Sequence, residues 1–315
     1  MKKKNPKMSA NISKIVLCTS TYYPIVEITN ELKGEELKKI KLANETSILR
    51  MQLALDTFRN VAKVGATCVL TDGGSNKEFF DEINKINSEA NREVIRVIPE
   101  TSAKEKMSMG ESRRLAFFSV FGGTIDEWNS GKRDVSDKEG AEFCLWIEPE
   151  KADLVTQENL EKILLTFTEQ NAEIVVPARM QEGWETLPQK QAWIEKRANR
   201  EAAKIVGSQN LDLWFGPKVF SRAAARFFLE SKGPRWEGLM EPVHRAIREG
   251  IAVVPASVNY KYDLRQKEME EGDLGDDFFS KRVTQYAEIQ AFLGNDIWKQ
   301  IGDEFRGSRS KKERK

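Results

Sequence analysis

The hydrophobic and polar positions of this chain follow two alternating patterns. Several short runs are almost continuously apolar, which is typical of strands buried on both faces of a sheet. These runs lie at residues 14–21, 66–75, 93–99, 144–148 and 172–179. Segments between them carry apolar residues at helical spacing, at residues 35–64, 79–90 and 157–170. The alternation predicts an α/β fold with a mostly parallel sheet, flanked by helices and joined by right-handed crossovers.

The second half of the chain is less regular. We expect a polar loop at residues 122–140 and a long functional loop at residues 180–200. A turn at residues 212–217 should precede a helix that contains Phe220, and a short helix at residues 241–250 should lead into further strand at residues 251–262. Residues 268–277 have the composition of an acidic linker, and residues 278–305 that of an amphipathic C-terminal helix.

The chain shows no internal repeat and no clear second core, which favours one main domain. We expect a basic disordered N-terminus at residues 1–11 and an α/β domain at residues 12–265. A C-terminal helical extension packed on this domain would follow at residues 266–305, and a basic tail at residues 306–315.

Glu148-Pro149-Glu150, which directly follows an apolar run, is the first candidate for chemistry. Pro149 cannot donate a hydrogen bond to a neighbouring strand, so the strand must end there. Open α/β sheets bind ligands at the carboxyl ends of their strands. The two acids are therefore candidates for a ligand or metal site, and solvated loop acids are the alternative.

Three other turns are expected at the same edge of the sheet. They are the polar residues 19–23, the turn Asp72-Gly73-Gly74, and a Gly/Ser turn that opens a helix with Arg113 and Arg114. Glycine lets the backbone approach a ligand closely, and a helix N-terminus with arginines favours an anion. Solvated helix charges are the alternative for the two arginines.

Composition narrows the chemistry further. The 50 Lys and Arg nearly balance the 49 Asp and Glu, and the net charge of +1 predicts no nucleic-acid partner. The single histidine excludes a multi-histidine metal site, which leaves catalysis to carboxylates, Lys, Arg, Tyr or backbone groups. Each of the three cysteines lies in an apolar run, as expected of reduced core thiols.

The sequence also bears on location. No apolar run reaches the roughly 18 residues of a membrane span, and the N-terminus lacks the apolar segment of a secretory signal. We therefore expect a soluble, cytoplasmic protein without a transmembrane segment. Basic residues gather at both ends of the chain, where solvated tails are the simpler interpretation and a weak peripheral contact with anionic membranes is the alternative.

In their order and spacing, these motifs resemble the nucleotide-sugar glycosyltransferases of the GT-A fold, most closely glycosyltransferase family 2. In this chain, residues 71–75 resemble the family's Asp-Asp-Gly-Ser motif, and Glu148-Pro149-Glu150 its Asp-X-Asp motif. Residues 212–217 resemble its acceptor-side turn, and residues 241–250 its helix with an acidic start. The resemblance spans roughly residues 12–265, and it implies a Rossmann-like fold of the GT-A type.

The resemblance also implies a function, that of a hexosyltransferase-like enzyme (EC 2.4) which moves a sugar from a UDP- or GDP-sugar to an unknown hydroxyl acceptor. The implied donor-binding residues are Thr19, Ser20, Thr21, Tyr23, Asp72, Gly73, Gly74, Arg113, Arg114, Glu148 and Lys151. A non-catalytic protein that binds nucleotide sugars on the same scaffold is the alternative.

A divalent cation, Mn²⁺ or Mg²⁺, is the implied cofactor. Glu148 and Glu150 would hold it, with His244 as a further ligand, although a packed histidine is the alternative for that residue. The first candidate for the catalytic base is Glu241 and the second is Glu237. A helix cap is the alternative role for Glu241.

Overall fold

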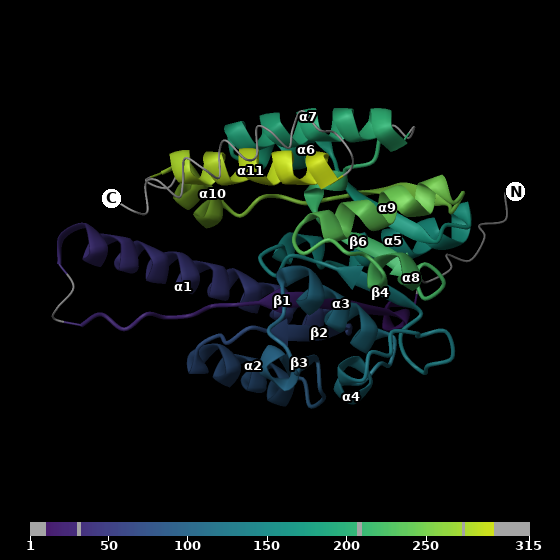
Figure 1. The fold of residues 1–315 in the computed structure, drawn as a ribbon, viewed down its shortest axis with the longest axis horizontal. Helices are drawn as coiled ribbons and strands as arrows, with labels where there is room; N and C mark the ends of the chain where they lie inside the picture. The colour runs from purple at the N-terminus through teal and green to yellow at the C-terminus, as the bar shows by residue number, and fades with distance from the viewer. Residues whose placement is uncertain (1–10, 30–32, 207–209, 273–274, 293–315) are drawn as a thin grey trace, which may run out of the picture.

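A computed structural model describes residues 11–29, 33–206, 210–272 and 275–292 (Figure 1). The basic tails expected at both ends lie outside the described residues, apart from Asn11, and so does the part of the expected C-terminal helix beyond residue 292. No helix in the described ranges is long and apolar enough to cross a membrane.

A seven-stranded sheet forms the centre of the described fold, with the strand order β3-β2-β1-β4-β6-β5-β7. Its strands are β1 (Ile15–Thr21), β2 (Thr67–Asp72), β3 (Ile95–Pro99), β4 (Phe143–Trp146), β5 (Ile174–Arg179), β6 (Lys218–Ser221) and β7 (Val253–Val258). Neighbouring strands pair in parallel except for β6, which is antiparallel to both β4 and β5. The expected α/β fold with a mostly parallel sheet is confirmed.

The strands are continuously apolar because both faces of the sheet are covered. In β1, Ile15 and Leu17 face one core, while Cys18 faces a second core on the opposite side. Leu145 and Cys144 of the neighbouring β4 divide in the same way. The three cysteines are free and buried, as expected of core thiols.

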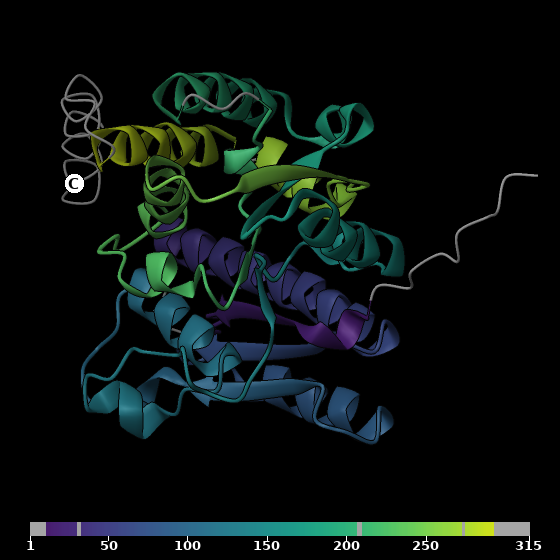
Figure 2. The same cartoon turned by 90° about the vertical axis from the view of Figure 1, so that its right-hand side faces the viewer.

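Helices form layers around this sheet (Figures 1 and 2). The first core is closed mainly by α1 (Gly34–Lys63), α2 (Lys77–Glu89) and α5 (Gln157–Gln170). The second is closed by α3 (Met109–Val120), α4 (Ile125–Asn129), α8 (Ala225–Leu229) and α9 (Glu237–Arg248). At one end, α6 (Gln181–Thr186), α7 (Gln189–Val206), α10 (Leu264–Glu271) and α11 (Gly275–Phe292) make a further layer.

Two expected loops contain helices, a short one in the first and longer ones in the second. Residues 122–140 contain α4, whose start is capped by Thr124 and Glu127 in a capping box. Residues 180–200 contain α6 and most of α7. Helix α7 is polar in overall composition but has a narrow apolar stripe: Ile194, Ala198 and Ala202 recur every fourth residue and are buried.

Three further expectations about the second half are wrong. Phe220 lies in β6 rather than in a helix, since it pairs with Cys144 and Ile174 in the middle of the sheet. The expected acidic linker overlaps α10 and the start of α11, and α10 begins with Asp263 as its N-cap. Helix α9 begins at Glu237, so Glu241 lies inside the helix and not at its start.

Candidate active site at the carboxyl edge of the sheet

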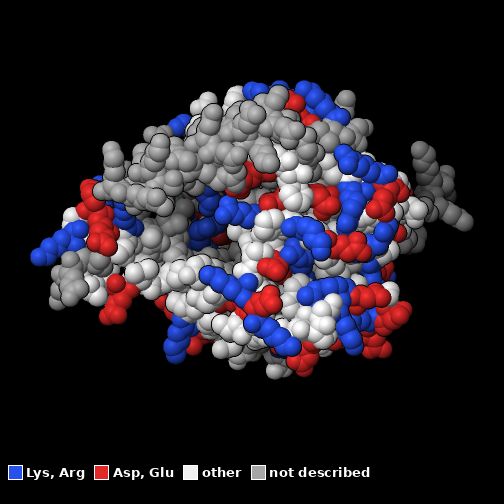
Figure 3. Space-filling view, in the orientation of Figure 1, with Lys and Arg blue, Asp and Glu red and all other residues white. Residues whose placement is uncertain are grey.

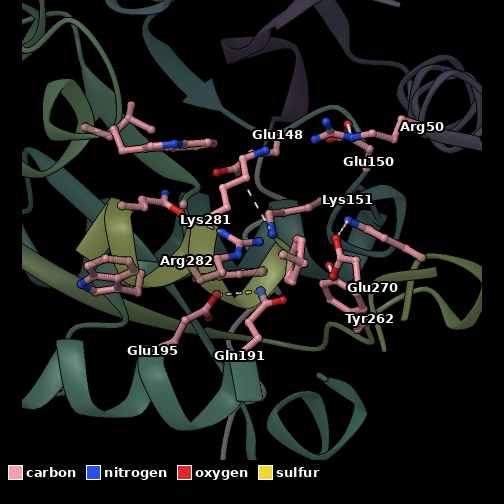
Figure 4. Close-up of a pocket in the computed structure, with 18 of the residues that line it drawn as sticks. Arg50, Glu148, Glu150, Lys151, Gln191, Glu195, Tyr262, Glu270, Lys281 and Arg282 are labelled. Atoms are coloured by element: carbon pink, nitrogen blue, oxygen red, sulfur yellow. Dashed lines mark hydrogen bonds and ion pairs between the residues drawn. The ribbon is translucent and has the colours of Figure 1, made fainter. Parts of the chain in front are cut away.

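A cavity of about 270 Å³ lies where β4 ends, between α1 and the layer of α10 and α11. Figure 3 shows this side of the molecule as hollowed, with lysine and arginine side chains at the hollow. The charged lining residues are Arg50, Lys151, Lys281, Arg282, Glu148, Glu150, Glu195 and Glu270 (Figure 4). Apolar lining comes mainly from Trp214, Phe215, Trp236, Leu239, Met240, Met269 and Phe278. The cavity thus combines balanced charges with an apolar and aromatic wall.

Helix α1 holds the Glu148-Pro149-Glu150 turn in place. The Thr57 hydroxyl donates a hydrogen bond of 2.5 Å to the carbonyl of Pro149, and the Asn60 amide donates one of 3.0 Å to the carbonyl of Ala152. One helical face also carries Arg50, whose Nε lies 2.8 Å from Oε1 of Glu150. Glu150 is therefore buried and paired with a cation from a distant part of the chain.

Glu148 has a different environment. Its carboxylate lies against Gly216, whose φ of +100° is unfavourable for any residue with a Cβ, and a Cβ there would overlap the carboxylate. Oε2 of Glu148 lies 4.0 Å from Nζ of Lys151, and this buried oxygen accepts no hydrogen bond. A buried carboxylate oxygen without a donor is expected to take a ligand, because leaving it unsatisfied is costly.

Two lysines provide positive charge near Glu148. Nζ of Lys218 is fully buried and donates to the carbonyls of Leu213, Gly216 and Pro217, at 2.9, 3.0 and 3.2 Å. Burial lowers the pKa of Lys218 to about 8, and the nearby Glu148 partly opposes this effect. Burial also lowers the pKa of Lys151, whose ammonium group lies over the ring of Phe215 at 4.8 Å. Both lysines therefore place positive charge near the Glu148 carboxylate, one from the chain just after it and one from β6.

A buried ion-pair network supports the turn at residues 212–217. The guanidinium group of Arg179 donates to both oxygens of Asp212, at 2.7 and 2.9 Å, and lies 2.7 Å from Glu195. Asn199 donates to Asp212 and accepts from the backbone N–H of Trp214. Although burial raises it, the pKa of Asp212 lies below its usual range because of Arg179. The network fixes the aromatic wall relative to Glu148.

Glu270 is a pocket carboxylate that the sequence did not indicate. It lies on α10, in a stretch expected to be a linker, and lines the same cavity as Glu148. The Tyr262 hydroxyl donates to Oε2 at 2.5 Å and the Gln266 amide donates to Oε1 at 3.0 Å. Burial raises the pKa of Glu270, and Arg282 and Arg50 oppose this. The signal that could have found it is the i, i+4 spacing of Gln266 and Glu270 after the Asp263 cap.

Asp72, expected to contact the donor, uses its carboxylate within the protein. Its oxygens accept hydrogen bonds from Thr21, from the backbone N–H groups of Gly74 and Ser75, and from the Ser75 hydroxyl. Such bonding stabilises the turn after β2. Asp72 therefore shapes the strand-end loop and does not line the cavity.

The remaining residues expected near the nucleotide base lie around this loop. Thr19 and Tyr23 are buried, and Tyr23 packs edge-on against Phe79. Ser20 is half-buried, while Tyr22 is 63% exposed and lies beside Gly73 and Gly74. None of Thr19, Ser20, Thr21, Tyr23, Gly73 and Gly74 lines the cavity. They lie at or just after the ends of β1 and β2, where Thr19, Thr21 and Tyr23 are buried.

Arg113 and Arg114 point to different places. The buried Arg113 guanidinium donates to the carbonyl of Arg235 and lies over the rings of Trp146 and Trp236, at 5.1 and 4.6 Å. Burial lowers its pKa to about 10. Arg114 donates to the carbonyl of Gly233. Neither arginine lines the cavity at Glu148.

The expected bases and the expected third metal ligand lie together on α9. Glu237 is buried, which raises its pKa, and Glu241 lies 3.8 Å from Arg245. His244 is buried, which lowers its pKa to about 4. None of Glu237, Glu241 and His244 lines the cavity, where α9 contributes Leu239 and Met240 instead.

These contacts show which residues at the cavity could hold a divalent cation. In the described ranges there is no group of three or more His, Cys, Asp and Glu that could hold a metal ion. Glu148 offers a buried oxygen without a donor, while Glu150 is paired with Arg50. Such a set suits Mg²⁺ or Mn²⁺ bound through one or two carboxylates, with further ligands from substrate phosphates and water.

No protein-family model matches the chain, and no curated protein sequence matches it. Solved structures do resemble it. Glucosyl-3-phosphoglycerate synthase from Mycobacterium tuberculosis, in complex with Mn²⁺, UDP and phosphoglyceric acid, is 9% identical at a TM-score of 0.48, covering 89% of this chain and 78% of that chain. The same enzyme with phosphoglyceric acid is 9% identical at a TM-score of 0.47, with coverages of 86% and 79%.

A further similar structure is that of a protein from Desulfovibrio desulfuricans G20, assigned as a nucleotide-diphospho-sugar transferase. It is 10% identical at a TM-score of 0.43, covering 89% of this chain and 98% of that chain. At these identities and TM-scores we draw no conclusion from the likeness, and the function has to be inferred from the residues of the site.

Proposed function

We propose that this protein is a glycosyltransferase that binds a nucleoside diphosphate sugar in the cavity at Glu148. The observation that carries the proposal is the orphaned carboxylate oxygen of Glu148, in a cavity whose lining includes Lys151, Arg50, Lys281 and Arg282. A donor of this class presents a diphosphate, hydroxyl groups and a flat base, which suit cations, carboxylates and aromatic rings respectively.

Charge balance supports a diphosphate together with a divalent cation. The lining carries four cationic and four anionic side chains, so the cavity is close to neutral. A diphosphate adds roughly two negative charges beside Glu148 and Glu150, and a divalent cation would restore neutrality at low cost in a poorly solvated site. We propose Glu148 as the main protein ligand of Mn²⁺ or Mg²⁺, with Glu150 held near it by Arg50. Such an ion would neutralise charge on the leaving diphosphate.

The donor would extend from the cavity toward the end of β1. Strands β1 and β4 are neighbours in the sheet, and Tyr22 and Glu148 follow them at the same edge. We propose that the base lies near Tyr22 and the Gly73-Gly74 backbone, with Asp72 holding that loop in shape. Thr19, Ser20, Thr21 and Tyr23 remain predictions as direct contacts, as do Arg113 and Arg114.

Glu270 is the carboxylate best situated to accept the proton of the acceptor hydroxyl. It lines the cavity, and two hydrogen bonds orient its oxygens. In the reaction, the acceptor oxygen bonds to the anomeric carbon, the bond from that carbon to the diphosphate oxygen breaks, and the nucleoside diphosphate leaves with the electron pair. The acceptor proton passes to Glu270. Glu241 and Glu237 remain the alternatives, at positions outside the cavity lining.

Calorimetric titration with nucleotides and nucleotide sugars tests this proposal. UDP-glucose is the first donor to try, since the M. tuberculosis enzyme binds it in one solved structure. GDP-, CMP- and dTDP-sugars follow, each with Mn²⁺ and with chelator. We expect one nucleotide to bind more tightly with metal, and slow hydrolysis of its sugar. Binding without turnover for any acceptor would favour the non-catalytic alternative, and absence of any nucleotide binding would exclude the proposal.

Matched variants test the assigned residues. Glu270→Gln should lower kcat by about 10²- to 10⁴-fold, the usual contribution of a general base, while donor affinity stays within about twofold. Glu268→Gln, on the exposed face of the same helix, should behave as the parent. If Glu270→Gln retains full activity, the base lies elsewhere, and Glu237→Gln and Glu241→Gln are then the variants to measure.

A further inference from the structure

A second hollow, of about 580 Å³, is lined by Ser231 and Lys232, which belong to the same loop as Trp236 of the candidate active site. Its lining comes from α3, from α4 and the chain after it, from the end of α8, and from α9. The charged lining residues are Arg114, Arg133, Lys232, Arg245, Glu111 and Glu230. Four cations thus face two carboxylates, in contrast to the balanced lining of the first cavity.

The positive charge is concentrated on Arg114 and Arg133. Neither arginine has an ion pair with another described residue, although the side chains of both are partly buried. Burial lowers the pKa of both side chains, the nearby Glu111 carboxylate partly opposes this for both, and Arg133 lowers the pKa of Arg114 further. Partly buried charges are normally paired, and here a single carboxylate, that of Glu111, is the nearby counter-charge of two arginines, which leaves positive charge for a further anion.

Both guanidinium groups are held in position by the backbone. Arg114 donates to the carbonyl of Gly233 at 3.2 Å, and Arg133 donates to the carbonyls of Trp128 and Lys132, both at 2.7 Å. The Arg133 guanidinium also stacks on the Trp128 ring, 3.6 Å from its centroid. Each guanidinium has five N–H donors, so several remain for a ligand in a fixed orientation.

The two carboxylates of the hollow are already engaged. Glu111 accepts from the backbone N–H of Ser108 in a capping box, and this bond lowers its pKa. Glu230 is exposed and lies 3.4 Å from Arg245, whose guanidinium also donates to the carbonyl of Phe227. Glu111 therefore caps a helix start and offsets only part of the charge of Arg114 and Arg133, and Glu230 pairs with one rim arginine. The four cations of the hollow still exceed its two carboxylates.

We propose that this hollow is a second binding site, for a dianionic phosphate monoester. Paired, pre-oriented guanidinium groups match a tetrahedral oxyanion, and they bind it through several charge-assisted hydrogen bonds. Arg245 and Lys232 add charge at the rim. The site is distinct from the donor cavity, because the two share no lining residue. It does not depend on the function proposed above.

Titration with phenyl phosphate and with inorganic phosphate, at constant ionic strength, tests the proposal. We expect phenyl phosphate to bind with a Kd below about 1 mM, and Arg133→Gln and Arg114→Gln each to weaken binding at least about tenfold. Lys132→Gln, an exposed neighbour outside the hollow that removes the same charge, is the matched control and should leave binding unchanged. Lys151→Met in the first cavity should also leave it unchanged.

Each other outcome overturns the proposal. No binding up to about 10 mM would mean that the hollow holds no phosphate ester at useful affinity. An equal loss in Lys132→Gln would indicate general attraction by surface charge, and a loss in Lys151→Met would assign the phosphate to the donor cavity. Tighter binding of inorganic phosphate than of phenyl phosphate would contradict an ester ligand. Should the Arg114 variant fail to fold, Lys232→Gln at the exposed rim should still weaken binding measurably.

Discussion

Replacing Gly216 by alanine is the sharpest single test of the candidate active site. Gly216 has a φ of +100°, and a Cβ at this position would overlap the carboxylate of Glu148. The substitution therefore combines two effects, backbone strain at residue 216 and displacement of Glu148. Alanine substitutions at other glycines can separate the two effects. Some of these glycines also have a positive φ, but no atom lies near the Cβ that alanine would add.

The size of each effect follows from the geometry. A residue with a Cβ in a sparsely populated backbone region costs about 1–3 kcal/mol, so Gly216→Ala should lose about that much stability. Real Cβ atoms essentially never lie within 3.0 Å of another atom, so the Glu148 carboxylate must move by about 1 Å. A shift of that size in a reacting group typically lowers activity by about 10²-fold.

Denaturant unfolding and donor titration measure the two effects separately. Gly65→Ala and Gly250→Ala are the controls, with φ of +75° and +77° and no atom within 4 Å of the added Cβ. We expect all three variants to lose about 1–3 kcal/mol of stability, and Gly216→Ala alone to lose donor affinity and activity. If Gly216→Ala matches the controls in donor affinity and turnover, the position of Glu148 does not govern the site.

Three further predictions concern the ion pairs, the histidine and the metal. Arg179→Met leaves Asp212 and Glu195 buried without their cation and should cost about 3–5 kcal/mol in urea unfolding, whereas Arg59→Met breaks exposed pairs and should cost at most about 1 kcal/mol. His244 is the only histidine, and burial, with a smaller effect of Arg248, lowers its pKa to about 4 against about 6.5 when unfolded. The unfolded chain therefore binds the proton more readily, and from pH 7 to pH 5 the folded state should lose about 2 kcal/mol through this group. His244→Leu should flatten that part of the stability–pH profile, and an unchanged slope would contradict the assignment. Chelation should weaken donor binding in the parent but not in Glu148→Gln, and a chelator effect that persists in this variant would assign the cation to other ligands.

Local patterns in the sequence determined much of this fold. The apolar runs became β1 to β5 because strands buried on both faces need apolar side chains at every position. Strand β4 ended at Trp146, shortly before Pro149, and left Glu148 and Glu150 at the edge where such sheets bind ligands. The position of these two acids at that edge could therefore be predicted from the local pattern, whereas Lys151, which lines the same cavity, was implied only by the family resemblance.

The sequence misled where the decisive interaction was distant. Asp72 follows a strand as a ligand residue would, yet donors from β1 and its own turn occupy its oxygens. Glu241 looked like a helix start because Pro242 follows it, but α9 begins one turn earlier, at Glu237. Local composition carries no information about which groups another element brings to the same place.

Only the tertiary structure decided how the site is completed. Arg50 reaches Glu150 from α1, Lys218 supports the Gly216 turn from the antiparallel strand β6, and Glu270 enters the cavity from α10. These residues lie 98, 70 and 122 positions from Glu148 in sequence. They meet because the strand order puts β1 and β6 on either side of β4, and because α10 and α11 pack over that edge. Periodicity reports which face of an element is buried, and packing decides what it is buried against.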